Sequence, residues 1–202
     1  NSQKDQRKEK HKPKKEMSRA YILIPTYNEA ENILLIIQSI LQQEQEIKKE
    51  GYTLWILVVD DNSPDKTGEK VREYAKKTKA NIAVVVRTGK RGRGLAGREG
   101  YQYALDNCAD LIIEMDADFS HDPQFLKQLI HATEKYDLVL GSRFVDGGKI
   151  QGRALWRNGV TMLANKYIQL MFNLNVKDCN SGYRCMKRKV LEAINPTLLE
   201  AE

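Results

Sequence analysis

The chain has 202 residues, of which 41% are hydrophobic and 30% are charged, and its formal net charge is +6 at pH 7. These values are typical of one globular domain with a sizeable core, and they exclude a chain that is disordered throughout. No stretch reaches the roughly 18 continuous apolar residues of a membrane-spanning helix, and most of the positive charge lies in residues 1–19, so the near-neutral remainder gives no reason to expect a nucleic-acid partner.

The leader, residues 1–16, is polar, rich in lysine and without periodicity, which predicts a disordered segment. The alternative is a polybasic segment attracted to anionic lipid headgroups. We expect residues 17–202 to form a single domain. Cys108, Cys179 and Cys185 have no metal-ligand spacing and are expected to be reduced thiols of a protein that faces the cytosol.

After the leader, apolar strands alternate with amphipathic helices. The apolar runs predict strands at residues 20–24, 54–59, 81–87, 111–115 and 138–141. Helical spacing predicts helices over 28–43, 67–77 and 123–136, and one from the basic, glycine-rich loop 89–94 to about 108. The charged residues 42–51 are expected to be a connection. This alternation is typical of an α/β fold with a mostly parallel sheet and right-handed crossovers.

Past Ser142 the alternation breaks. We expect a loop at 147–152, a helix at 157–172, a polar turn at 178–184 and a last helix from about Lys187. The 157–172 helix has an apolar side, which we expect to pack onto the sheet. The alternative is an interfacial helix that lies on a membrane.

Polar motifs directly follow four of the predicted strands. They are residues 25–29, Asp60-Asp61, Asp116 with Asp118, and Ser142-Arg143. In a parallel sheet these positions share the edge at the carboxyl ends of the strands, where open α/β sheets bind ligands. Each motif alone has a structural explanation, such as a helix cap, a turn or an exposed arginine. Together they predict a ligand cleft.

The residue types indicate what this cleft could bind. Asp116 and Asp118 repel one another unless a cation or donor lies between them. With the hydroxyl of Ser120 they offer hard oxygen ligands that suit Mg²⁺ or Mn²⁺. Asp61 can accept hydrogen bonds from a base or ribose, and Tyr27 offers a ring for stacking. A solvated acidic turn is the alternative for the carboxylate pair.

Lys90, Arg91 and Arg93, in the basic glycine-rich loop, can approach phosphates, although a solvated turn is an equal alternative. The glycines lack the spacing of a Walker or dinucleotide-binding motif. No Ser/His/Asp or Cys/His arrangement is apparent. His121, expected in a turn, and His131, expected on a helix surface, receive no mechanistic role.

Four ordered motifs resemble family 2 glycosyltransferases of the GT-A fold. They are Pro25-Thr26-Tyr27-Asn28-Glu29, Val58 to Asp65, Met115 to His121, and Gly141-Ser142-Arg143. Agreement runs from about Ala20 to Leu191, and within the family the chain is most similar to the dolichol/polyprenol phosphate mannose synthases. The resemblance implies a GT-A domain with a mostly parallel, Rossmann-like sheet flanked by helices.

The resemblance also implies an activity: inverting transfer of mannose from GDP-mannose to the phosphate of a dolichyl or polyprenyl phosphate, with Mg²⁺ or Mn²⁺. By position, the guanosine would be held by Pro25, Tyr27, Glu29, Val59 and Asp61, and the ribose–diphosphate side by Asp116 and Ala117. The metal would be held by Asp116, Asp118 and Ser120, with Asp118 as the principal ligand. The donor and acceptor phosphates would be held by Arg143, Arg157 and Thr161.

Asp118 and Arg143 would therefore carry the catalysis. A phosphate acceptor is already an anionic nucleophile, so the mechanism needs little from a general base. The metal would neutralise charge on the departing diphosphate, while arginines, which suit bidentate phosphate capture, would hold the attacking oxygen in line.

The chain departs from the family pattern at several positions. Lys66 stands where similar enzymes usually have glycine, Arg91-Gly92-Arg93-Gly94 replaces the common Leu-Gly-Leu-Gly, and Asn180 replaces a threonine. Similar enzymes also continue well past the position of Glu202, so we expect a truncated chain or a minimal variant.

Three other functions compete with mannosyl transfer. A UDP-glucose:polyprenyl-phosphate glucosyltransferase would share nearly every motif. An inactive nucleotide-sugar-binding scaffold is a second alternative, against which the intact Asp116, Asp118 and Arg143 argue. A nucleic-acid-binding domain, suggested by the basic leader, conflicts with the acidic site.

A lipid-linked acceptor implies that the enzyme reaches a membrane. We expect peripheral attachment through the leader, through the 157–172 helix, or through a membrane-embedded partner subunit. The expected location is the cytoplasmic face of a membrane, that of the endoplasmic reticulum in a eukaryote or the plasma membrane in a prokaryote.

Overall fold

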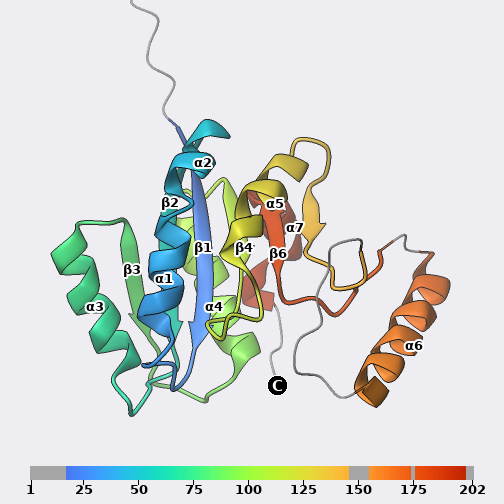
Figure 1. Ribbon diagram of the computed structural model, residues 1–202, viewed down its shortest axis with the longest axis horizontal. Coiled ribbons are helices and arrows are strands. Elements are labelled where there is room, and N and C mark those ends of the chain that lie inside the picture. The colour runs from blue at the N-terminus through green and yellow to red at the C-terminus, as the bar shows by residue number, and fades with distance from the viewer. Residues whose placement is uncertain (1–16, 146–154, 174–175, 199–202) are drawn as a thin grey trace, which may run out of the picture.

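The computed structural model describes residues 17–145, 155–173 and 176–198. The predicted leader at 1–16 and the predicted loop at 147–152 lie outside these residues. Figure 1 shows the described part as a sheet with helices against both of its faces and one helix, α6 (Leu155–Phe172), standing apart.

The sheet has six strands in the order β3-β2-β1-β4-β6-β5. The strands are β1 (Ser18–Thr26), β2 (Tyr52–Asp60), β3 (Ile82–Val86), β4 (Leu111–Glu114), β5 (Leu138–Leu140) and β6 (Arg184–Lys187). β1 pairs in parallel with β2 and β4, and β2 pairs in parallel with β3. β6 runs antiparallel to its neighbours β4 and β5. The predicted α/β fold with a mostly parallel sheet is confirmed.

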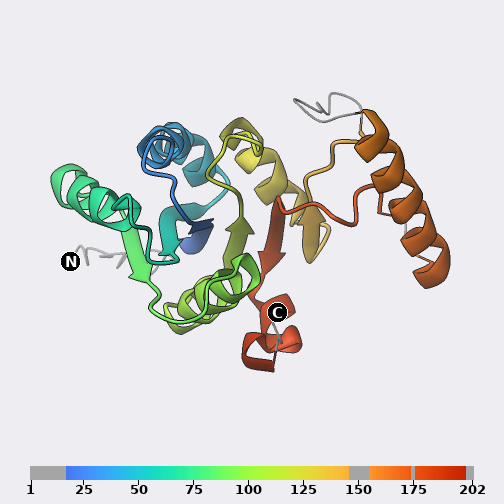
Figure 2. The same ribbon diagram turned by 90° about the horizontal axis from the view of Figure 1, so that it is seen from below.

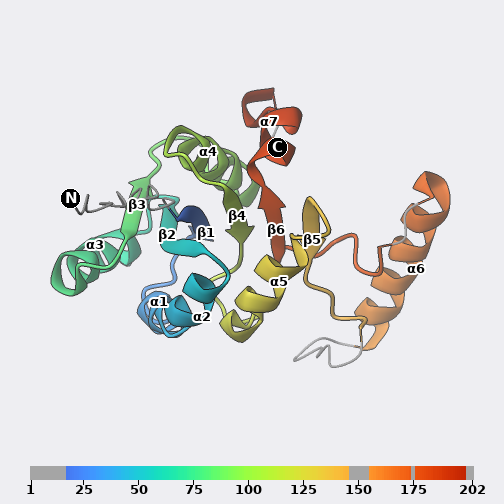
Figure 3. The ribbon, with the colours of Figure 1, turned by 90° about the horizontal axis from the view of Figure 1, so that it is seen from above.

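The central strands are apolar runs because helices cover both of their faces. Successive side chains of a strand point to opposite faces, so Ile22 and Ile24 join one core and Tyr21 and Leu23 the other. The first core is covered by α1 (Ile33–Leu41), α2 (Glu44–Lys49), α3 (Thr67–Thr78) and α5 (Leu126–Ala132). The second is covered by α4 (Arg93–Asp106) and α7 (Arg188–Ile194). Figures 2 and 3 show the two layers of helices on either side of the sheet.

The helix predicted over 28–43 begins later, at Ile33. Asn28 takes a left-handed φ of +58°, and the carbonyl of Glu29 accepts hydrogen bonds from the next turn of the chain. Residues 28–32 are therefore a loop, and they belong to the candidate site rather than to the helical layer.

Two further predictions differ from the observed helices. The connection predicted at 42–51 contains α2, whose acids lie in its first turn and whose lysines lie in its last, as the helix dipole favours. The helix predicted over 123–136 is divided into a 3-10 turn, η1 (Pro123–Phe125), and the shorter α5. A second 3-10 turn, η2 (Pro196–Leu198), follows α7.

β6 is absent from the sequence-based prediction, in which a polar turn leads straight into the last helix. Its four residues have charged ends and no apolar alternation, so little in the local sequence marks a strand. Cys185 pairs with Ile113 of β4 on one side and Val139 of β5 on the other. The strand is thus defined by partners that are distant in the chain.

The prediction that the helix at 157–172 packs onto the sheet is wrong. From residue 159 onward its apolar side chains are largely exposed, with 72% of Leu163 and 76% of Leu170 accessible to solvent. Figure 3 shows α6 well to one side of the sheet. Two side chains of its inner face, Asn165 and Gln169, hydrogen-bond the main chain of residues 176–179.

Two glycines of α4 allow a test of how closely this helix packs on the sheet. A Cβ at Gly100 would clash with Cδ1 of Leu23 and lie 3.1 Å from Cγ2 of Val59, whereas a Cβ at Gly97 would meet nothing nearer than 3.9 Å. Alanine is favoured over glycine in a helix by up to about 1 kcal/mol, but overpacking a core costs about 1–3 kcal/mol. We therefore expect Gly97→Ala to raise the free energy of unfolding and Gly100→Ala to leave it unchanged or lower it by up to about 2 kcal/mol. Urea denaturation of both variants measures this, and equal stabilisation by both would contradict it.

Candidate functional site

The predicted motifs meet at the carboxyl edge of the sheet, the lower edge in Figure 1. The N–H of Asp61, just after β2, donates to the carbonyl of Thr26 at the end of β1. The N–H of Met115, just after β4, donates to the carbonyl of Leu23. The chain leaves β1 for β2 on one side and reaches β4 on the other, so this edge is the topological switch point at which such sheets bind ligands.

The loop after β1 is held by the turn after β2. The N–H groups of Asn28, Glu29 and Ala30 donate at 2.9–3.0 Å to the side chains of Ser63, Thr67 and Asp65 respectively. Two motifs that are separated in the chain are therefore one structural unit, and the positions of Tyr27 and Glu29 depend on the turn.

Asp60, the last residue of β2, stabilises this turn through hydrogen bonds. Its buried carboxylate accepts hydrogen bonds from the N–H and the hydroxyl of Ser63. The turn also forces two residues, Asn62 and Lys66, into the left-handed region, with φ of +56° and +64°. The resemblance implies glycine at this position, and the left-handed φ of Lys66 fits that expectation, since glycine has no Cβ to strain.

Asp61 is buried and already holds two donors of the chain. One oxygen forms an ion pair with Nη1 of Arg87, and the other accepts the N–H of Gly92 at 2.8 Å. Arg87 also binds Glu99 through Nε at 2.9 Å and the carbonyl of Lys90 through Nη2 at 3.1 Å. The basic loop is thereby tied to Asp61.

Arg87 has no role among the sequence-based predictions. It stands at the end of a predicted strand, as the recognised motifs do, so a search for polar residues at strand ends would have identified it. Pro25 is half-buried at the end of β1 and Val59 is fully buried in β2, so Val59 presents no surface to a ligand.

Tyr27 is exposed, but one face of its ring is covered. The guanidinium of Arg91 lies 4.5 Å from the ring centroid, and its Nη1 donates to the tyrosine hydroxyl at 2.6 Å. Such a cation–π contact contributes about 0.5–1 kcal/mol at an exposed site. A base that stacks on Tyr27 must use the other face of the ring or displace Arg91.

The acidic motif after β4 is half-buried at Asp116 and exposed at Asp118. Asp118 accepts the N–H of Ser120 at 2.9 Å, in a turn where Phe119 has a φ of +61°. Burial raises the pKa of Asp118, but the hydrogen bonds from Ser120 outweigh it and lower that pKa. Ala117 between them is buried in the core. Carboxylate and hydroxyl oxygens fit Mg²⁺ or Mn²⁺ by their chemistry.

Asp116 itself is paired with a cation of the chain. Its Oδ1 lies 2.7 Å from Nη2 of Arg93. Burial raises the pKa of Asp116, Arg93 opposes this, and the charge of Asp118 adds to it. A cation that binds both carboxylates would relieve their mutual repulsion.

His121 shapes the acidic loop rather than changing its charge near neutral pH. Its Nδ1 accepts the N–H of Asp116 at 3.0 Å, and its ring stacks on Tyr183 at 5.0 Å. Burial lowers the pKa of His121 to about 4, so the imidazole is neutral at pH 7. Because Nδ1 is an acceptor here, its contact with the Asp116 carboxylate at 3.9 Å is not a charge pair.

A second acid, Glu114, lies deeper at the end of β4. It is buried, accepts the hydroxyl of Tyr101, and lies 3.5 Å from Nε of Arg184. None of these three residues has a role among the sequence-based predictions. The negative charge at the end of β4 therefore includes Glu114 as well as the two predicted carboxylates. Arg93 from α4 and Arg184 from β6 lie close to Glu114 and compensate its charge.

Arg143 lies after β5 and is bound to Asp178. Its Nε and Nη2 donate to the two carboxylate oxygens at 2.9 and 3.0 Å. Burial raises the pKa of Asp178, but the hydrogen bonds and charge of Arg143 outweigh it and hold that pKa below its usual range. The two other predicted phosphate residues, Arg157 and Thr161, belong to α6, which stands apart from the sheet; the side chain of Arg157 lies outside the described part.

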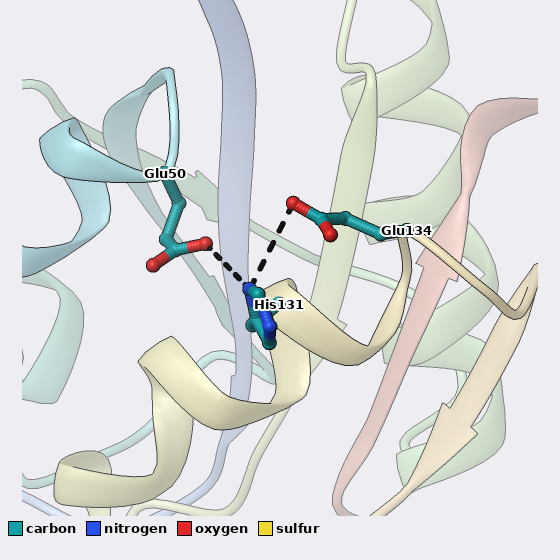
Figure 4. Close-up of side chains that lie close together, drawn as sticks. All are labelled: Glu50, His131 and Glu134. Carbon is teal, nitrogen blue, oxygen red and sulfur yellow. Dashed lines mark hydrogen bonds and ion pairs between the residues drawn. The ribbon is translucent and has the colours of Figure 1, made fainter.

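A different group of metal-capable side chains lies at the opposite edge of the sheet (Figure 4). Glu50, at the end of α2, lies 3.1 Å from Nδ1 of His131 on α5, and Glu134 lies 3.8 Å from the same atom. His131 and Glu134 are exposed, as predicted for His131. We interpret the group as a polar cluster that joins α2 to α5. It is distant from the strand-end motifs, so it is not part of the candidate site.

Residues 21–194 match the family described as Glycosyl transferase family 2. The chain belongs to this family. It is 35% identical over 185 residues to the polyprenol monophosphomannose synthase of Mycolicibacterium smegmatis, covering 91% of this chain and 67% of that protein. It is also 35% identical over 184 residues to the undecaprenyl-phosphate mannosyltransferase of Micrococcus luteus, covering 91% of this chain and 72% of that protein.

Solved structures support the fold of this family 2 glycosyltransferase. The mannosyltransferase PcManGT from Pyrobaculum calidifontis, solved in complex with GDP-Man and Mn²⁺, has a TM-score of 0.59 to this chain at 20% identity. The match covers 90% of this chain and 48% of that one. The shared architecture confirms the predicted GT-A fold.

The left-handed turn offers a direct test of strain. Lys66→Gly removes a Cβ whose strain in this conformation costs about 1–2 kcal/mol. Glycine also raises the conformational entropy of the unfolded chain, which lowers stability, but the relief of strain is at least as large as this loss. We expect the free energy of unfolding to stay unchanged or rise by up to about 1 kcal/mol. The matched control is Lys76→Gly in α3, which should cost about 0.5–1 kcal/mol. Thermal and urea denaturation compare the two; an equal loss in both variants would refute the strain.

Proposed function

We propose that this chain transfers mannose from GDP-mannose to the phosphate of a polyprenyl or dolichyl phosphate, with inversion at the anomeric carbon. The observation that carries the proposal is the Asp116–Asp118 pair at the end of β4, surrounded by the other strand-end motifs of a family 2 glycosyltransferase. The printed activities of the two mannosyl-transferring relatives support the choice of sugar and acceptor.

The nucleotide would bind between the loop after β1 and the turn after β2. Asp61 can accept further donors from a base, because a carboxylate has about four lone-pair positions and the chain uses two of them. Tyr27 offers its uncovered ring face, and Glu29 is fixed by its N–H bond to Thr67. Pro25 and Val59 would support the pocket from the strands.

Mg²⁺ or Mn²⁺ would be held by Asp118, Asp116 and Ser120, with Asp118 as the principal ligand. When bound, the metal supplies charge that stabilises the departing diphosphate. Ala117, with Asp116, would meet the ribose–diphosphate side, and His121 holds this turn by accepting the N–H of Asp116. The residues of the chain therefore hold the leaving-group side of the reaction.

The acceptor side would be organised by Arg143, with Arg157 and Thr161 from α6. Asp178 uses two of the five N–H donors of the Arg143 guanidinium and fixes its plane, and the fork offers its other donors to a phosphate. A phosphate oxygen is already a nucleophile, so positioning rather than proton removal is the task of the site.

We expect Asp118→Ala to lower mannosyl transfer by at least about 100-fold, because the departing diphosphate loses its metal-held charge compensation. The assay is radiolabel transfer from GDP-mannose to a polyprenyl phosphate with Mg²⁺ or Mn²⁺. Asp106→Ala, an exposed carboxylate at the end of α4, is the matched control and should retain wild-type activity. Wild-type transfer by Asp118→Ala would refute the assignment, and calorimetric binding of UDP-glucose in preference to GDP-mannose would favour the glucosyltransferase.

We propose further that α6 rests on the membrane that carries the acceptor, at its cytoplasmic face. No helix in the described part of the chain is both long and apolar enough to cross a bilayer. Instead, α6 exposes one large apolar face, formed by Val160, Leu163, Tyr167, Leu170 and Met171. An amphipathic helix with such a face can lie in the lipid headgroup region. Two of the three proposed acceptor-phosphate residues, Arg157 and Thr161, lie in its first two turns, which would place them at the membrane surface.

We expect the double variant Leu163→Glu/Leu170→Glu to reduce binding to anionic phospholipid vesicles by at least about tenfold, because each buried leucine contributes about 1.5–3 kcal/mol. Flotation of the full chain measures binding. The matched control is Leu35→Glu/Leu198→Glu, two leucines that are likewise exposed, at 56% and 74%. Equal loss in both variants would contradict a role for α6. Loss only on deletion of residues 1–16 would assign attachment to the leader.

A further inference from the structure

Arg93 places a positive charge beside the acidic residues that are proposed to hold the metal and the diphosphate. It begins α4, and the family resemblance of the basic, glycine-rich loop implies leucine at this position. Its guanidinium crosses from the basic loop to the acidic one, where Nη2 lies 2.7 Å from Asp116 and 3.9 Å from Glu114. A leucine could make neither contact.

A space beside Gly182 accommodates this guanidinium. A Cβ on Gly182 would overlap Nη2 of Arg93 and lie 3.3 Å from Cε1 of His121. The turn before β6 therefore leaves room for the side chain only because residue 182 is a glycine. Three segments surround the guanidinium: the start of α4, the acidic loop and the turn that holds Gly182. Even so, 54% of the side chain is accessible, so it can move toward a ligand.

The pairing has a consequence for metal binding. Asp116 is one of the two carboxylates proposed for Mg²⁺ or Mn²⁺, and one of its oxygens is engaged by Arg93. A divalent cation must compete with the guanidinium for this carboxylate. The displaced guanidinium would then face the negative charge of a diphosphate, for which arginine is well suited.

We propose that Arg93 is a resident cation of the diphosphate site, which neutralises Asp116 until a divalent cation binds and then turns to the donor's diphosphate. This role rests on the proposed function and adds a residue to it. The pairing lowers the affinity for metal alone and makes metal and nucleotide binding depend on one another. Metal binding would release Arg93 for the diphosphate, and diphosphate binding would release Asp116 for the metal.

The test measures Mn²⁺ and GDP binding by calorimetry, without turnover. In Arg93→Leu, the affinity for Mn²⁺ alone should rise about 3- to 10-fold, since a competing charge worth about 1 kcal/mol is gone. The affinity for GDP in saturating Mn²⁺ should fall about 10- to 100-fold, since a charge-assisted contact is lost. The control is Arg91→Leu, which removes the same charge from the same loop but contacts Tyr27, and should leave Mn²⁺ binding within about twofold of wild type.

Gly182→Ala provides a second variant that keeps the arginine. Its Cβ should push the guanidinium off Asp116 and raise Mn²⁺ affinity as Arg93→Leu does, with no further increase when the two changes are combined.

A fall or no change in Mn²⁺ affinity in Arg93→Leu would overturn the proposal. If the wild-type chain binds neither Mn²⁺ nor GDP, the proposed function fails as well. If it binds both and Arg93→Leu behaves like it, only the role of Arg93 fails.

Discussion

The candidate site depends on the parallel pairing of β1 with β2 on one side and with β4 on the other. This pairing brings three strand ends to one edge, and hydrogen bonds from Asp61 to Thr26 and from Met115 to Leu23 set their relative heights. The strands can be buried on both faces only because α4 covers one face while α1, α3 and α5 cover the other. Polar residues are therefore confined to the strand ends, where the loops meet.

Three carboxylates at this edge are paired with arginines. Asp61 is bound to Arg87, Asp116 to Arg93, and Asp178 to Arg143. A buried carboxylate that lacked such a partner would carry a large desolvation cost. The same pairs restrict what the site can do, because a nucleotide, a metal or a phosphate must share or replace a group that the chain already uses. Binding to this site is thus an exchange of partners as well as an addition of contacts.

The membrane proposal and the chemistry of the site are connected through α6. The helix exposes its apolar face away from the sheet, while Asn165 and Gln169 hold it to the segment that leads to Asp178. Asp178 in turn fixes Arg143. A helix resting on lipid would therefore be linked, through few residues, to the arginine proposed to hold the acceptor phosphate.

Much of the fold could be predicted from the sequence, because its signals are local. The apolar runs of β1, β2 and β4, the helical spacing of α3 and the polar residues after each strand are all visible within short windows. The carboxylates at Asp116 and Asp118, and their place at a strand end, could be recognised in the same way. β6 could not, because its four residues become a strand only between Ile113 and Val139.

The sequence by itself determined the alternation of strands and helices, the family, and which residue types stand at the strand ends. Only the tertiary structure decided which charges are paired. The partners of Asp61, Asp116 and Arg143 lie 26, 23 and 35 residues away in the chain, and no periodicity links them. The structure also decided that α6 stands apart from the sheet. Amphipathic spacing identifies an apolar face, but whether protein or another apolar phase covers that face depends on the packing of the whole chain.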